Sequence, residues 1–131
     1  MKRRTAREKA LQAVFQVDVG KIEPKDAFAS VLKEGEDDPF LQSLVFGTID
    51  HLKELDEMIG NQLENWTIDR LGNIDRNLLR IAAYEMVFER DIPHSVSINE
   101  AVEIAKKFGD DRSPKFINGV LSKIKNHLET E

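Results

Sequence analysis

Residues 73–93 read NIDRNLLRIAAYEMVFERDIP, and this stretch decides the fold class. Ile74, Leu78 and Ile81 recur at intervals of three and four residues, which places them on one face of an α-helix. Pro93 prevents the helix from continuing, because proline lacks the backbone N–H that a helix interior needs. The pattern therefore predicts a buried helix that starts after an Asn73 cap and ends shortly before the proline.

The same spacing recurs along the rest of the chain, and the alternating pattern of β-strands is missing. Thr5 and Ser97 each stand three residues before a glutamate, the spacing of a capping box at a helix start. Prolines at first helical positions mark other starts. We expect helices at about residues 5–17 (or from 3 or 4), 24–32, 39–63, 66–72, 74–90, 98–108 and 114–128. The sequence thus predicts an all-α fold with about seven helices in two small packed helical bundles.

The length of 131 residues suits one domain, residues 1–131, in which two helical halves of about 1–65 and 66–131 share a core. The chain has no cysteine, which favours a reducing, cytoplasmic location over disulfide-bonded export. Its longest apolar runs are only three residues, far shorter than a membrane span. We therefore expect no membrane association.

Positive charge is concentrated at one end of an acidic chain. Residues 2–9 carry a net charge of +4, although the whole protein carries −5. At 100° per residue, Arg3 and Arg7 fall on the side of Ala10 and Val14, so they extend the apolar stripe. Because an unpaired guanidinium cannot be buried, we expect the stripe to leave the core near Ala6 and the first turn to grip phosphates. A solvated, frayed end is the alternative.

Two further features need an interpretation. Glu85 falls on the inward face of its helix, so we expect it to accept hydrogen bonds from the start of another helix, around residues 96–98. Lys115, Phe116 and Lys123 share one side of the last helix with Gly119. A base could stack there while phosphates are neutralised, although Phe116 at the margin of the core explains the pattern as well.

Enzyme signatures are missing from the sequence. There is no P-loop, no G-x-G-x-x-G and no Glu-x-x-His, and the three histidines are scattered. No nucleophile stands in a recognisable catalytic motif. We expect no catalysis, no metal and no cofactor.

Four segments together resemble the NusB family of bacterial transcription factors. They are RRTAREKALQAVFQ (3–16), LGNIDRNLLRIAAYEM (71–86), IPHSVSINEAVEIAKKFG (92–109) and SPKFINGVLSKI (113–124). The resemblance covers nearly the whole chain, and residues 20–40 match least. It implies an all-helical fold of two small bundles and a role in transcription antitermination without catalysis.

The resemblance also implies partners and site residues. Members of the family pair with NusE, a small-subunit ribosomal protein, and the pair binds boxA RNA. Together with other Nus factors, the complex lets RNA polymerase read through termination signals, notably in ribosomal RNA operons. The positions that should contact RNA are Lys2, Arg3, Arg4, Arg7, Lys115, Phe116 and Asn118. The positions that should contact NusE are Phe15, Asp69 and Asp75. A homodimer of the free protein stays open.

Two alternatives remain. The same helical module resembles the N-terminal RNA-binding domain of certain ribosomal RNA cytosine methyltransferases, which need a further catalytic domain; Met1 and the polar end of residues 126–131 favour a complete chain instead. The second alternative is an adaptor that binds only proteins. RNA contacts would give a steep salt dependence, which an adaptor would lack.

Overall fold

The computed structural model describes residues 1–130, and every regular element within them is helical. The helices are α1 (Arg3–Asp18), α2 (Pro24–Val31), α3 (Pro39–Asp50), α4 (Leu52–Gly60), α5 (Asn73–Phe88), α6 (His94–Phe108) and α7 (Ser113–Glu129). A short 3-10 turn, η1 (Ile68–Arg70), precedes α5. The predicted all-α class with seven helices is confirmed. No helix in residues 1–130 is long and apolar enough to cross a membrane.

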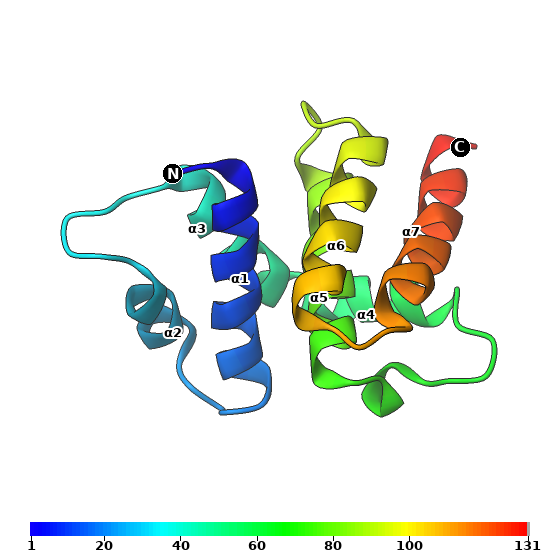
Figure 1. Cartoon of the computed structure of the whole chain (residues 1–131), viewed down its shortest axis with the longest axis horizontal. Coiled ribbons are helices and arrows are strands. Elements are labelled where there is room, and N and C mark those ends of the chain that lie inside the picture. The colour runs from blue at the N-terminus through cyan, green and yellow to red at the C-terminus, as the bar shows by residue number, and fades with distance from the viewer. Residues whose placement is uncertain (131) are drawn as a thin grey trace.

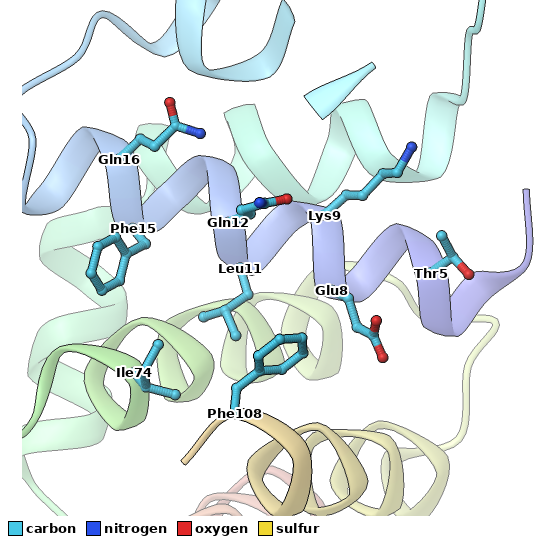
Figure 2. Close-up of a pocket in the computed structure, with 9 residues that line it drawn as sticks. All are labelled: Thr5, Glu8, Lys9, Leu11, Gln12, Phe15, Gln16, Ile74 and Phe108. Carbon is cyan, nitrogen blue, oxygen red and sulfur yellow. The ribbon is translucent and has the colours of Figure 1, made fainter. Parts of the chain in front are cut away.

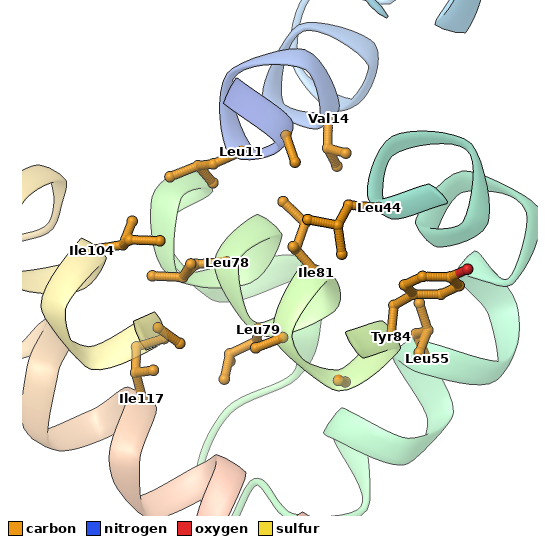
Figure 3. Close-up of a cluster of buried hydrophobic side chains, with 14 of the residues drawn as sticks. Leu11, Val14, Leu44, Leu55, Leu78, Leu79, Ile81, Tyr84, Ile104 and Ile117 are labelled. Atoms are coloured by element: carbon orange, nitrogen blue, oxygen red, sulfur yellow. The ribbon is translucent and has the colours of Figure 1, made fainter. Parts of the chain in front are cut away.

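Helix α5, whose sequence predicted the class, lies at the centre of the molecule. Figure 1 shows α1, α2 and α3 on one side of it, α6 in front of it and α7 on the other side. In Figure 3, Leu78 of α5 lies beside both Leu11 of α1 and Ile104 of α6, and all three belong to one continuous core. Fully burying an aliphatic side chain of this size contributes about 1.5–3 kcal/mol, so helix α5 makes a large share of the packing energy.

The start signals from proline and aspartate are confirmed at α2 and α3. Pro24 and Pro39 occupy first helical positions, and the Asp38 carboxylate accepts a hydrogen bond from the Leu41 amide at 3.0 Å. The predicted continuous helix over residues 39–63 is wrong, because it is broken at His51. The Nδ1 atom of His51 lies 2.9 Å from the carbonyl oxygen of Gly47, and its ring packs 4.3 Å from that of Phe88.

The two predicted capping boxes are also wrong. Helix α1 begins at Arg3, which confirms the alternative start left open by the sequence and places Thr5 inside the helix. Helix α6 begins at His94, one turn before Ser97. The Ser97 hydroxyl is buried and donates to Glu85 instead of capping a helix. Its capping-box partner Glu100 is also engaged elsewhere, by Arg4. Both side chains of the motif therefore bind residues of other helices and do not cap α6.

Candidate nucleic-acid interface

The basic start of α1 forms an exposed cationic surface with three of its four predicted residues. Lys2, Arg3 and Arg4 are exposed at the N-terminal end of α1, where the helix dipole adds positive potential. The Arg3 guanidinium lies 4.2 Å from the centre of the Phe40 ring, a cation–π contact that orients it. These side chains can reach phosphates without any rearrangement of the core.

Arg4 is exposed but already has a carboxylate partner. Its Nε and Nη2 atoms donate to the two oxygens of Glu100 at 3.0 and 2.7 Å. This hydrogen bonding lowers the pKa of Glu100 below its ordinary value and raises the pKa of Arg4. The carboxylate of α6 therefore occupies the site that a phosphate would take on this arginine.

Arg7 is placed differently from the prediction. Its side chain is only 6% exposed, and its Nε and Nη2 atoms donate to the Glu85 carboxylate, both at 2.8 Å. The Ser97 hydroxyl donates to the same carboxylate at 2.5 Å, and Glu100 lies 3.4 Å from Arg7 Nη1. The expectation that the apolar stripe leaves the core near Ala6 is therefore wrong, because a buried partner satisfies the guanidinium.

The buried Arg7 network joins three helices. It connects α1 through Arg7, α5 through Glu85 and α6 through Ser97. The expectation that Glu85 accepts a hydrogen bond from residues 96–98 is confirmed at Ser97, whereas its main partner Arg7 was missed. Both residues stood out in the sequence as charges on an apolar face. Their opposite charges were the signal from which the contact between Arg7 and Glu85 could have been predicted.

The predicted residues of the last helix lie apart from the start of α1. Lys115 and Asn118 are exposed on α7, and Phe116 is partly buried against the core. Figure 1 shows the first turn of α7 in the lower half of the molecule and the first turn of α1 in the upper half, on the opposite side of α5. The two sets of predicted RNA contacts therefore form separate patches, and a ligand that reaches both must cross the molecule.

Two adjoining grooves surround the start of α7. One, of about 260 Å³, is lined by Trp66, Lys115, Phe116, Gly119 and Lys123 among others. The other, of about 600 Å³, shares Trp66, Lys115 and Phe116 with it and continues towards Asp75. Sequence reasoning did not single out Trp66, although an isolated tryptophan in a polar segment was the available signal.

A third groove, the α1–α6 groove, lies between the middle of α1 and the end of α6. Figure 2 shows Leu11 and Phe15 of α1 pointing towards Ile74 and Phe108 in this groove, which has a volume of about 600 Å³. Phe108 is 45% exposed, and the Lys107 ammonium lies over its ring at 5.2 Å from the ring centre. Polar side chains of α1, including Glu8, line its rim. This arrangement fits an apolar anchor of a protein partner.

The two predicted acidic contacts lie on η1 and at the start of α5. Asp69 is exposed, and a hydrogen bond from the Thr67 hydroxyl lowers its pKa. Asp75 directly follows Ile74 of the α1–α6 groove, and burial raises its pKa. Its Oδ1 atom is buried without a hydrogen-bond partner.

These features define a class of protein, a small all-helical binding module with a cationic helix start, an aromatic groove beside lysines and an apolar groove beside carboxylates. In residues 1–130 no group of three or more histidine, aspartate or glutamate side chains could hold a metal ion. The chain belongs to the NusB family, whose family model matches residues 4–126.

Individual relatives agree with this membership. The chain is 58% identical over 131 residues to the transcription antitermination protein NusB of Bacillus pumilus, and the match covers 100% of both chains. It resembles the structure of T. maritima NusB with a TM-score of 0.87 and 37% identity, over 95% of this chain and 90% of that chain. A structure of the antitermination factors NusB and NusE in complex with double-stranded RNA matches with a TM-score of 0.86 and 31% identity, over 95% and 96% of the two chains.

Proposed function

We propose that the protein is a non-catalytic transcription antitermination factor that binds boxA-type RNA together with a NusE-type ribosomal protein. One observation carries the proposal: the fold matches, over 95% of the chain, a structure in which NusB occurs with NusE and RNA. Action on ribosomal RNA operons, association with RNA polymerase and other Nus factors, and a cytoplasmic location belong to the same proposal.

In this function the cations set RNA affinity and the polar and aromatic groups set preference. Lys2, Arg3 and Arg4 would neutralise phosphates at the start of α1, and Lys115 would do so on α7. Asn118 is exposed on α7 and can meet the edge of an unpaired base. Phosphate neutralisation carries no sequence information, so the two patches have different roles.

Arg7 has a positioning role in this proposal. Because its guanidinium is buried against Glu85, it holds the first turn of α1 against α5 and α6. The RNA then meets Arg3 and Arg4 in a fixed place instead of on a frayed end. Loss of RNA binding in an Arg7 variant would be indirect and would accompany a loss of stability.

The α1–α6 groove would receive the ribosomal protein. Phe15 and the 45% exposed Phe108 line this groove. Asp75, next to Ile74 in the chain, lines the larger groove at the start of α7 and adds a half-buried carboxylate. Asp69 adds a second, exposed carboxylate nearby in the chain. Since ribosomal proteins are generally basic, a body with a net charge of −5 suits one as a partner.

Fluorescence anisotropy with labelled boxA RNA and a scrambled control, with and without NusE at two salt concentrations, tests the function. The wild type should prefer boxA, bind more tightly with NusE and lose affinity in salt. Arg3→Ala with Arg4→Ala should reduce the salt slope by about 0.7 for each lost phosphate contact. Arg7 is left intact so that folding is unaffected. Absence of binding to either RNA at both salt concentrations, with NusE binding intact, would favour the protein-only adaptor.

A variant with the opposite expected effect sharpens this test. Glu100→Gln removes the charge that competes with phosphate for Arg4 but leaves Glu85 paired with Arg7. We expect tighter RNA binding with a steeper salt slope. If Glu100→Gln and wild type bind equally, Arg4 does not contact phosphate in the complex.

A further inference from the structure

Trp66 is the only tryptophan of the chain, and the fold leaves it exposed. It stands between α4 and η1, and 58% of its surface is accessible. Tryptophan is usually well covered in folded proteins because its large apolar area favours burial. The side chain therefore adds little to the core and is available to a ligand.

The surface beside Trp66 has room for a flat ring. Trp66 and Phe116 line both grooves at the start of α7, so two aromatic side chains from distant parts of the sequence share one hollow. Gly119, one turn beyond Phe116, lines the smaller groove, and a Cβ atom added there would meet nothing within 4 Å. The missing side chain keeps this part of the groove open.

The charges around these rings differ from those at the start of α1. Arg4 and Arg7 have carboxylate partners, whereas Lys115 makes no ion pair with residues 1–130. Lys123 pairs with Glu64 at 3.3 Å, but both side chains are at least half exposed. An exposed pair of this kind contributes little, so a phosphate can displace the carboxylate easily.

The larger groove also contains acidic groups, and these limit where phosphates can approach. Asp110 accepts hydrogen bonds from the Arg112 and Ser113 amides, so its carboxylate is used to start α7. Asp75 and Asp111 line the far part of this groove, away from the smaller one. The smaller groove has one carboxylate, Glu64, against two lysines, and it is the part that suits a polyanion.

We propose that Trp66 and Phe116 form a stacking site for one unpaired RNA base, with Lys115 and Lys123 neutralising the phosphates beside it. The inference rests on the proposed RNA-binding function and adds Trp66 and Lys123 to its site. An aromatic pair beside lysines is the usual means by which proteins hold single-stranded nucleic acid. Stacking tolerates any base, so the site selects an unpaired base over a paired one.

The single tryptophan makes a direct test possible. Intrinsic fluorescence is titrated with boxA RNA, and anisotropy of labelled RNA is measured in parallel on the same protein. Stacking on Trp66 should quench its fluorescence with the dissociation constant that anisotropy gives. A series of RNAs with one abasic position each should contain one member that binds without the full quenching.

Matched variants distinguish the contribution of an aromatic ring to RNA binding from the contribution of apolar surface alone. Trp66→Leu should weaken RNA binding about 5-fold to 100-fold, whereas Trp66→Phe should stay close to wild type, because only the second retains a ring. Gly119→Leu should weaken binding too, since it fills the groove and leaves Trp66 unchanged. Binding of NusE without RNA serves as the folding control.

The outcomes distinguish this inference from the proposed function. If anisotropy shows RNA binding while fluorescence stays constant and Trp66→Leu binds normally, the stacking site is refuted and the function stands. Equal losses in Trp66→Leu and Trp66→Phe would also refute stacking. If Trp66→Leu weakens only NusE binding, the surface docks a protein instead. If no RNA binds at all, both the function and the inference fail.

Discussion

The Arg7 guanidinium is held between a buried carboxylate and a half-buried one. Glu85 is 1% exposed and makes two hydrogen bonds to Arg7, and Glu100 closes the outer side. A buried ion pair gains little over well-packed apolar side chains, because both charges lose their hydration. Removal of one partner is costly, because the other charge then remains buried alone. The pair thus fixes how α1 is placed more than it adds stability.

Arg7→Ala should therefore destabilise the protein by about 3–5 kcal/mol, as measured by urea unfolding followed by circular dichroism. The double variant Arg7→Met with Glu85→Leu should recover most of this loss, because neither charge is left buried. Arg4→Ala, which removes an exposed partner of Glu100, is the matched control and should change stability little. Wild-type stability in Arg7→Ala would contradict the buried pair.

Asp75 should show the opposite relation between charge and stability. Burial raises the pKa of its carboxyl above the ordinary value of 3.8. The folded state therefore holds the proton more tightly than the unfolded state, and stability falls as pH rises between the two pKa values. Asp75→Asn should raise the melting temperature at pH 7, and this gain should disappear near pH 3.

The same Asp75→Asn variant should bind NusE more weakly, since the half-buried side chain loses the negative charge that would attract a basic partner. Asp91→Asn, at an exposed site outside the predicted contacts, is the control for a general charge effect and should change neither stability nor NusE binding. A melting temperature of Asp75→Asn that follows the wild type at every pH would show that burial of this carboxylate costs nothing.

At the scale of the element, the close contact between α3 and α5 depends on one glycine. A Cβ atom added to Gly47 would lie 2.1–2.3 Å from ring atoms of Tyr84, and Tyr84 stacks on Phe88. Gly47→Ala should destabilise the protein by about 1–3 kcal/mol through overpacking, as measured by thermal unfolding. Gly119→Ala, in open space within α7, should instead be neutral or gain about 0.5–1 kcal/mol. A loss of the same size in both variants would contradict this contact.

Local signals in the sequence predicted most elements, and tertiary contacts explain the failures. Pro24 and the Asp38–Pro39 pair act within one turn, so the starts of α2 and α3 were predictable. The break at His51 was not, because the apolar stripe continues across it to Leu55 and Ile59. At the break the His51 ring packs on Phe88, a residue of another helix, and such a contact is not visible in the local pattern.

The candidate site divides in the same way. The exposure of Lys2 and Lys115 could be predicted, because both lysines lie outside the apolar stripes of their helices. Arg7 was grouped with its exposed neighbours because its partner stands 78 residues away in the chain, and only the presence of two opposite charges on apolar helix faces pointed to the pair. Trp66 could not be placed either, because its exposure depends on how the loop before η1 lies against α7.

At the scale of the whole molecule, α5 belongs to both sides of the core. Leu79 of α5 is fully buried in the cluster that also contains Val14 of α1 and Ile117 of α7. The two proposed halves, about residues 1–65 and 66–131, therefore share one hydrophobic core. We expect the described chain to unfold as a single cooperative unit.

Leu79→Ala tests this expectation, because it creates a cavity in the shared core. The variant should lose about 2–5 kcal/mol, and amides of α1 and α7 should lose the same free energy of opening in hydrogen exchange. Ala29→Gly, on the exposed face of α2, is the control and should lower protection in α2 without an equal loss in α7. If Leu79→Ala lowers protection in α7 but leaves α1 as in the wild type, the halves fold independently and α5 belongs to only one of them.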